Sequence, residues 1–237
     1  MRAVGPKPAL GGEFVIGLIG DSIGAGYGQI STGDGSDGLH YGGATVPAAT
    51  TVVTLSVSQT PLTVWPDSLT GVSPDPGLMP RLCELALAAG YSSVTLVRHA
   101  VLSAPTGTVR HSYAPSVLGY LTSVGKRAHL MVVCASTNDS QTGESTALAA
   151  LAPIVVADIE AQHPDARLAW LLPGCVQGVG FDEADATRAG VIAAVAGKAT
   201  RYTVDGRLHA LADTSHPTLA GYRSIAEAIW AAYQAGG

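Results

Sequence analysis

Short apolar runs alternate with segments of helical periodicity along most of the chain. The apolar runs lie at residues 13–19, 94–97, 129–134 and 168–172, with a shorter extended piece at 202–204. Segments with helical spacing lie at residues 78–86, 107–124, 148–159, 182–200 and 219–233. Continuous apolar strands that alternate with amphipathic helices are typical of a parallel sheet buried on both faces. The pattern therefore predicts one α/β domain over residues 1–237, with about five parallel strands and helices on both faces.

The stretch at about residues 28–77 interrupts this alternation, and we interpret it as an insertion. Apolar and polar residues alternate at 53–58 and again at 62–64, with Thr60-Pro61 between the two runs. This pattern predicts a β-hairpin or a pair of edge strands. The rest of the stretch is rich in Gly, Asp, Ser and Pro, and we expect it to be loop.

The charge composition excludes two classes of protein. Only 13% of the 237 residues are charged, about half the ~25% of an average soluble domain, and 47% are hydrophobic, which excludes charge-driven disorder. The formal net charge is -5, and no Lys or Arg occurs between Lys7 and Arg81. A nucleic-acid-binding surface needs clustered basic side chains to neutralise phosphates. We therefore expect no nucleic-acid partner.

Membrane insertion, export and disulfide formation are not expected from this sequence. No run approaches the ~20 apolar residues of a transmembrane helix, and the segment 1–8 lacks the apolar core of a secretory signal. We therefore expect a cytoplasmic protein without a membrane span. The cysteines are widely spaced and odd in number, so we expect reduced thiols that behave as small apolar side chains. They are Cys83, Cys134 and Cys175.

Three polar clusters are placed where a parallel sheet collects its chemistry. Gly20–Gly24 follows the first predicted strand, Ser136–Asp139 follows the strand at 129–134, and Asp213–Pro217 comes directly before the last helix. Ligands and reacting groups in open α/β sheets gather at the carboxyl ends of the strands. We therefore expect these clusters to converge on one site.

Together the clusters contain the groups that acyl transfer requires. Ser22 is the candidate nucleophile, and His216 is the candidate base that takes its proton and returns it to the leaving group. Asp213, three residues before His216, is expected to hold the imidazole in the required tautomer. Asn138 and the backbone N–H of Ser22 are candidates for stabilising the developing oxyanion.

These residues resemble the motifs of the SGNH (GDSL-type) hydrolases. The resemblance rests on Gly20-Asp21-Ser22 near the N-terminus, the Asn138-Asp139 pair in mid-chain and Asp213-x-x-His216-Pro217 near the C-terminus, and it covers residues 13–235 apart from the insertion. It implies a flavodoxin-like three-layer α/β sandwich and an esterase, lipase, thioesterase or carbohydrate deacetylase activity. It also implies a Ser22-His216-Asp213 triad, an oxyanion hole formed by Asn138 and the Ser22 N–H, and no cofactor.

Two positions depart from the family pattern. The family usually has glycine in Gly-x-Asn-Asp, where this chain has Ser136. The family also places a glycine after the second strand as another oxyanion donor, whereas residues 98–104 contain none. Val101 lies nearest that place, and its backbone N–H is the remaining candidate. A side chain at this position would crowd the acyl group.

Other catalytic and binding patterns fit less well. Gly20-Asp21-Ser22-Ile23-Gly24 matches the G-x-S-x-G pattern of α/β-hydrolases, but the nucleophile follows the first strand, which leaves no room for the earlier strands of that fold. The glycines at 24–28 suggest a dinucleotide loop, but Gln29 occupies the position of its last glycine. The histidines lack metal-ligand spacing, so we expect no metal.

The insertion suggests the class of substrate. Tyr41 and Trp65 are candidates for stacking on a sugar or an acyl chain, or for packing the insertion onto the domain. A polar insertion without a long apolar lid favours a small-acyl ester, acetyl first of all, on a carbohydrate. The alternatives are a lysophospholipase or thioesterase, and a catalytically silent module that binds a glycan or a protein.

Overall fold

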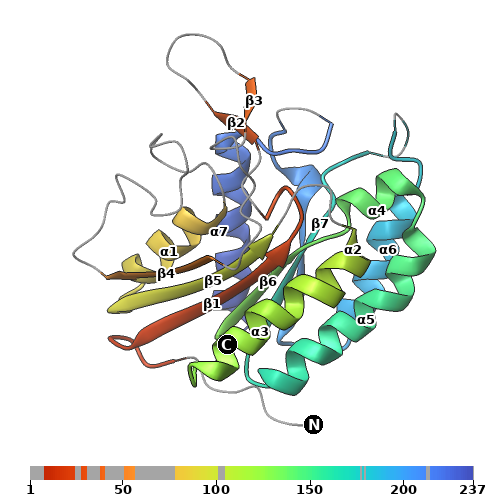
Figure 1. Cartoon of the computed structure of the whole chain (residues 1–237). Coiled ribbons are helices and arrows are strands. Elements are labelled where there is room, and N and C mark those ends of the chain that lie inside the picture. The colour runs from red at the N-terminus through yellow and green to blue at the C-terminus, as the bar shows by residue number, and fades with distance from the viewer. Residues whose placement is uncertain are drawn as a thin grey trace.

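The computed structural model describes residues 8–24, 28–30, 38–40, 51–56, 78–100, 105–176, 178, 180–211 and 214–236. Its centre is a six-stranded sheet with the strand order β4-β5-β1-β6-β7-β8 (Figure 1). The strands are β1 (Glu13–Gly20), β4 (Thr51–Ser56), β5 (Ser93–Ala100), β6 (Leu130–Cys134), β7 (Arg167–Leu172) and β8 (Arg201–Asp205).

Five of these strands are parallel, and β4 pairs antiparallel with β5 at one edge. Numbered along the chain, the parallel strands have the order 2-1-3-4-5, which is the flavodoxin-like arrangement. The predicted fold class is confirmed. In this topology the direction of winding reverses between β1 and β6, so their carboxyl ends border the place where ligands bind in such sheets.

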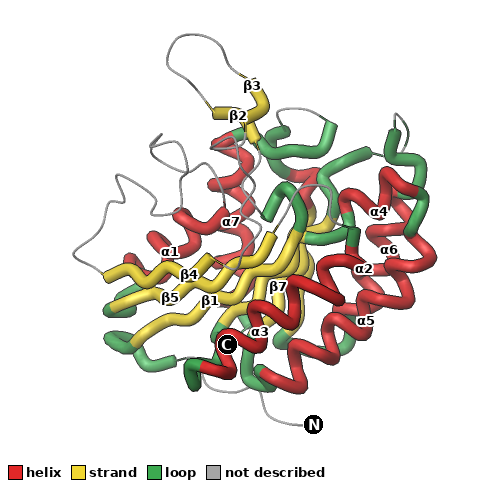
Figure 2. The backbone as a smooth tube through the Cα atoms, viewed as in Figure 1, coloured by secondary structure: helices red, strands yellow, loops and turns green. Residues whose placement is uncertain are grey.

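Helices cover both faces of the sheet (Figures 1 and 2). Side chains of β1 alternate between the two cores, which explains its continuous apolar run: Phe14, Ile16 and Leu18 face one core, whereas Val15 and Ile19 face the other. The first core is closed by α1 (Leu78–Ala88) and α7 (Leu219–Ala235). The second is closed by α3 (Ala114–Ser123), α5 (Ser145–Gln162) and α6 (Ala184–Val195).

The helix expected at 107–124 contains three consecutive parts. It starts with the short α2 (Thr106–Thr108), continues as a π-helical segment, η2 (Val109–Tyr113), and ends as α3. Its beginning is close to the carboxyl edge of the sheet, because α2 starts six residues after β5 and Thr106 bonds to Asp139 on α4, shortly after β6. This helical segment therefore connects the site edge to the second core.

The insertion contains more strand than the sequence predicted. β2 (Gly28–Ile30) and β3 (Gly38–His40) form a separate antiparallel pair where we expected loop, so that prediction was wrong at these residues. The expected edge strand is present as β4. The second alternating run, at 62–64, lies outside the described residues.

Among the described residues, α5 is the one helix whose length and composition would suffice to cross a membrane. Its Leu148, Val155 and Ile159 belong to the core between the sheet and the helices. The three cysteines are all buried and none forms a disulfide, as the sequence predicted.

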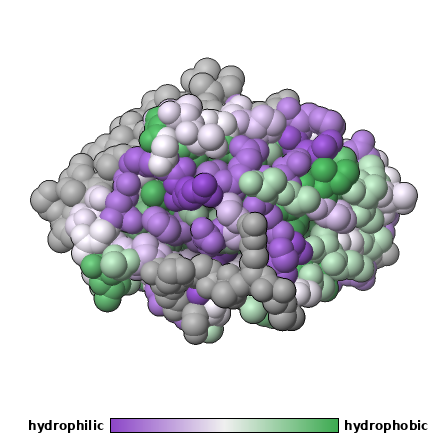
Figure 3. Space-filling view, turned by 90° about the horizontal axis from the view of Figure 1, so that it is seen from below, coloured by the Kyte–Doolittle hydropathy of each residue, from purple (hydrophilic) through white to green (hydrophobic). Residues whose placement is uncertain are grey.

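The exposed apolar side chains are spread over several elements. Figure 3 shows the molecule from below, with hydrophilic residues gathered across the middle of that face. The most exposed large apolar residues of the described chain come from several helices and loops. They are Leu10, Val124, Val176, Ile192 and Leu208.

Candidate active site

The turn after β1 is fixed by contacts with the neighbouring strand β6. A Cβ atom on Gly20 would lie 2.7 Å from the carbonyl oxygen of Cys134, so this position requires glycine. The next N–H, of Asp21, donates to the same Cys134 oxygen at 2.8 Å. The Asp21 carboxylate then accepts from the N–H of Ile23 at 3.0 Å. These contacts hold Ser22, which is 3% exposed, at the carboxyl end of the sheet.

His216 is positioned by the chain entering α7. Pro217 forms an antiparallel bridge with Leu211, and the N–H of Thr218 donates to the carbonyl of Ala210 at 2.9 Å. Thr218 also caps α7, because its hydroxyl accepts from the N–H of Gly221 at 3.0 Å. A Cβ on Gly221 would lie 2.1 Å from the Ala210 oxygen, so glycine is needed for this close approach.

The structure brings Ser22 and His216 together. The Ser22 Oγ atom lies 3.0 Å from Nε2 of His216. On the other side of the imidazole, Nδ1 lies 3.2 Å from the hydroxyl of Ser215, which is 6% exposed. When Nε2 accepts a hydrogen bond from Ser22, Nδ1 carries the ring proton and is the donor on the other side of the ring. Ser215 was not foreseen from the sequence, and its adjacency to His216 was the only signal available there.

Asn138 lies at the same edge of the sheet, on a short helix that the sequence did not predict. This helix, α4 (Thr137–Thr142), begins three residues after β6, and β6 pairs directly with β1. Asn138 is half-buried. The link from β6 to α4 is held from β7, because the Trp170 indole N–H donates to the carbonyl of Ala135 at 2.9 Å.

Ser136 has a backbone conformation that favours glycine. Its φ is 116° and its ψ is -18°, and it is the only non-glycine residue with positive φ among those described. Its carbonyl accepts from the N–H and the hydroxyl of Ser140 at 3.2 and 2.9 Å. Its own hydroxyl is fully buried without a hydrogen-bond partner. The turn into α4 explains why glycine suits this position, and the serine here holds a strained backbone.

Asp21 is a buried carboxyl beside the candidate nucleophile. Burial raises the pKa of Asp21 to about 7, with a smaller contribution from the charge of Asp139. Hydrogen bonds from the backbone N–H groups of Ile23 and Gly24 lower the pKa and oppose this shift in part. Its second oxygen, Oδ2, is buried without a hydrogen-bond partner. Its bond from the N–H of Ile23 gives Asp21 a local role in holding the turn before Ser22.

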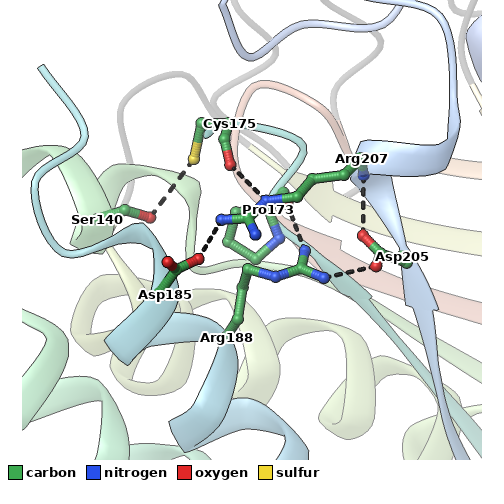
Figure 4. Close-up of polar contacts among 7 residues, drawn as sticks. All are labelled: Ser140, Pro173, Cys175, Asp185, Arg188, Asp205 and Arg207. Atoms are coloured by element: carbon green, nitrogen blue, oxygen red, sulfur yellow. Dashed lines mark hydrogen bonds and ion pairs between the residues drawn. The ribbon is translucent and has the colours of Figure 1, made fainter. Parts of the chain in front are cut away.

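An arginine network ties the loops after β7 and β8 together (Figure 4). Arg188 donates to the carbonyl of Pro173 at 2.8 Å and to the Asp205 carboxylate at 2.6 Å. Arg207, in the 3₁₀ turn η3 (Gly206–Leu208), donates to the carbonyl of Cys175 at 3.0 Å. The Cys175 thiol in turn contacts the hydroxyl of Ser140 on α4 at 3.8 Å. The chain leading to His216 and the helix carrying Asn138 are thereby connected.

Four candidate residues from the sequence fall outside the described residues. They are Asp213, Val101, Tyr41 and Trp65. Within the described ranges, no group of three or more His, Cys, Asp or Glu side chains is placed to hold a metal ion.

The described geometry has the fold of the SGNH (GDSL-type) hydrolases. No family model matches the sequence, and no curated protein is similar to it. Solved structures with this fold are similar at low sequence identity. A lipase/acylhydrolase from Enterococcus faecalis is 14% identical, with a TM-score of 0.60 over 94% of this chain and 96% of that one.

Two carbohydrate-active enzymes are similar in the same way. Est24, a carbohydrate acetylesterase from Sinorhizobium meliloti, is 10% identical, with a TM-score of 0.55 over 94% of this chain and 99% of that one. A family two carbohydrate esterase from Clostridium thermocellum, in complex with cellohexaose, is 18% identical with a TM-score of 0.55. The match covers 95% of this chain but only 64% of the length of the C. thermocellum enzyme.

Proposed function

We propose that this protein is a serine ester hydrolase that removes a small acyl group, acetyl first of all, from a carbohydrate. The observation that carries the proposal is the 3.0 Å approach of the Ser22 hydroxyl to Nε2 of His216 at the carboxyl edge of the sheet. Two of the structures that share its fold belong to carbohydrate esterases, which supports the choice of substrate class.

The proposed reaction has two steps, acylation and deacylation. In the first, His216 Nε2 accepts the Ser22 proton while Oγ attacks the ester carbonyl carbon, and the oxyanion is stabilised by the Ser22 N–H and the Asn138 amide. The ester C–O bond then breaks, and the leaving alcohol takes the proton from His216. In the second step, water attacks the acyl-serine with His216 again as base, which releases the acid and restores Ser22. The resemblance gives Asp213 the role of orienting His216.

A panel of p-nitrophenyl esters of increasing chain length tests this proposal. We expect kcat/KM to be highest for acetate and to fall steeply for longer chains, and Ser22→Ala to lose at least ~10³-fold of the wild-type value. Ser123→Ala is the matched control, because this exposed hydroxyl donates to the carbonyl of Tyr120 on α3. A preference for long chains would favour a lipase-like or thioesterase activity instead.

The alternative function, a catalytically silent module that binds a glycan or a protein, is suggested by the missing glycine after the second strand. A fluorophosphonate probe separates the two functions, because it labels only an activated serine. Labelling of wild type but not of Ser22→Ala is the expected result. A folded wild-type protein that resists the probe and hydrolyses no ester would favour binding over catalysis.

A further inference from the structure

Asp139 connects two elements that meet at the candidate oxyanion hole. Its carboxylate is 1% exposed and accepts three hydrogen bonds, all from Thr106 at the start of α2. The Thr106 N–H is shared between the two carboxylate oxygens at 3.2 and 3.0 Å, and the Thr106 hydroxyl donates to Oδ2 at 2.8 Å. Thr106 is itself fully buried. We call these three bonds the Asp139–Thr106 clamp.

The clamp joins α4 to the start of α2. Adjacent residues of an α-helix point about 100° apart, since a turn contains ~3.6 residues. Asp139 therefore faces α2, while the neighbouring Asn138 points elsewhere and stays half-buried. The indole of Trp170 holds the Ala135 end of the link, as described above. These two contacts restrain the rotation of α4, together with the contact between Ser140 and Cys175.

A buried carboxylate is a costly way to hold two elements together. Burial raises the pKa of Asp139, and the hydrogen bonds from Thr106 oppose that shift only in part. A well-packed apolar pair in the same place would often be as stable or more stable. What the carboxylate adds is direction, because three hydrogen bonds to one side chain fix an orientation that apolar contacts leave adjustable.

We propose that Asp139 is a positioning residue for the oxyanion hole: through its clamp on Thr106 it sets the orientation of the Asn138 amide toward the carbonyl attacked by Ser22. The inference rests on the proposed esterase function. The competing interpretation is that Asp139 only caps α2, whose N-cap residue, Pro105, offers no side-chain acceptor. Both interpretations predict a loss of stability when the clamp is broken, so stability cannot separate them.

A double-mutant cycle on hydrolysis of p-nitrophenyl acetate separates the two interpretations. Thr106→Val removes one hydrogen bond at nearly constant shape, and Asp139→Asn weakens all three. We expect each to lower kcat by about 10–100-fold with KM changed less than about threefold, because a small misplacement of a catalytic group costs up to ~10². Thr106→Ser keeps the hydroxyl and is the matched control, with kcat expected within about threefold of wild type.

The decisive comparison uses Asn138→Ala as a second background. If the clamp acts through Asn138, Thr106→Val and Asp139→Asn should change kcat by less than about threefold once the amide is absent. An equal loss of kcat in both backgrounds would overturn the inference and leave a capping role. The thermal unfolding midpoint of every variant is measured, and the assays are run well below the lowest midpoint. Differences in kcat then do not reflect unfolding of a variant.

The same data distinguish a failure of the inference from a failure of the proposed function. Wild-type protein without Ser22-dependent hydrolysis would overturn the proposed esterase, and the inference with it. An active wild type whose kcat is unchanged by Asp139→Asn would overturn the inference alone.

Discussion

The Ser22 hydroxyl lies 3.0 Å from Nε2 of His216, although 194 residues separate the two in the chain. Each side chain is held by backbone contacts of its own strand or helix end. Ser22 follows a turn bonded to Cys134, and His216 precedes a helix start bonded to Ala210. The fold itself therefore brings the two side chains within hydrogen-bonding distance.

Removing the imidazole should abolish turnover without unfolding the protein. We expect His216→Ala to lower kcat/KM for p-nitrophenyl acetate by at least ~10³-fold, because the variant lacks the imidazole that lies 3.0 Å from Ser22 Oγ. His209→Ala is the matched control, since this histidine pairs with Ser224 at 2.6 Å instead. Near-wild-type turnover of His216→Ala, measured with a matched unfolding midpoint, would contradict the assigned role.

The buried Asp21 predicts a pH dependence of stability. Its folded pKa of about 7 is above the ordinary value of 3.8, so between these pH values the folded state keeps a proton that the unfolded chain has lost. The free energy of unfolding should therefore fall as pH rises through this window. Asp21→Asn mimics the protonated form and removes this contribution. Urea unfolding from pH 4 to 8 should show the variant gaining stability relative to wild type toward pH 8.

Two neighbours must be considered in that experiment. Burial also raises the pKa of Asp139, which contributes a slope of the same sign, so Asp21→Asn should reduce the dependence without abolishing it. The nearby Cys134 thiol, whose pKa burial raises well above 9.0, stays neutral throughout. Asp165→Asn, at an exposed turn, serves as the control. An unchanged pH slope in Asp21→Asn would disprove the prediction.

Ser136→Gly should stabilise the protein. Removing the strain of the positive φ should raise the free energy of unfolding by about 1–2 kcal/mol. The greater conformational freedom of glycine in the unfolded chain should lower it again by up to ~1 kcal/mol. We expect a net gain of about 1 kcal/mol, seen as a higher midpoint in thermal or urea unfolding. Ser136→Ala separates the causes, because it removes the unpartnered hydroxyl but keeps the Cβ. Equal gains in both variants would assign the effect to the hydroxyl.

Arg188 should stabilise the loops after β7 and β8. Partial burial acts to raise the pKa of Asp205, but hydrogen bonds from Arg188 and the Arg207 N–H outweigh it, so the pKa lies below its usual value. Arg188→Met leaves Asp205 and the Pro173 carbonyl without this partner, and we expect a loss of about 1–3 kcal/mol at neutral pH.

The pH dependence of this loss has a definite sign. A carboxyl with a lowered folded pKa stabilises above its unfolded pKa, and that stabilisation disappears as pH falls through the folded value. The difference between wild type and Arg188→Met should thus be greatest near pH 7 and shrink in acid. Arg223→Met, at an exposed position of α7, is the control. A loss that is constant down to the acid transition would point to packing instead of charge.

The sequence by itself determined the architecture. Apolar runs such as 129–134 and 168–172 form strands buried on both faces, and this requires helices on both sides. The glycines at 20 and 221 are also required by local geometry, because at each of them another backbone segment comes too close for a Cβ atom. Ser22, Asn138 and His216 were identified because each follows or precedes a predictable element end.

Only the tertiary structure decided how these ends meet. The positive φ of Ser136, the helix α4, the contact of Ser215 with His216 and the Asp139–Thr106 clamp have no periodic signal. The strand pair β2–β3 was missed for a related reason, because its three-residue strands are too short for alternation to be recognised. The clamp joins residues 33 positions apart in the chain, and the Ser22–His216 pair joins residues 194 positions apart, so only the folded chain brings such partners within hydrogen-bonding distance.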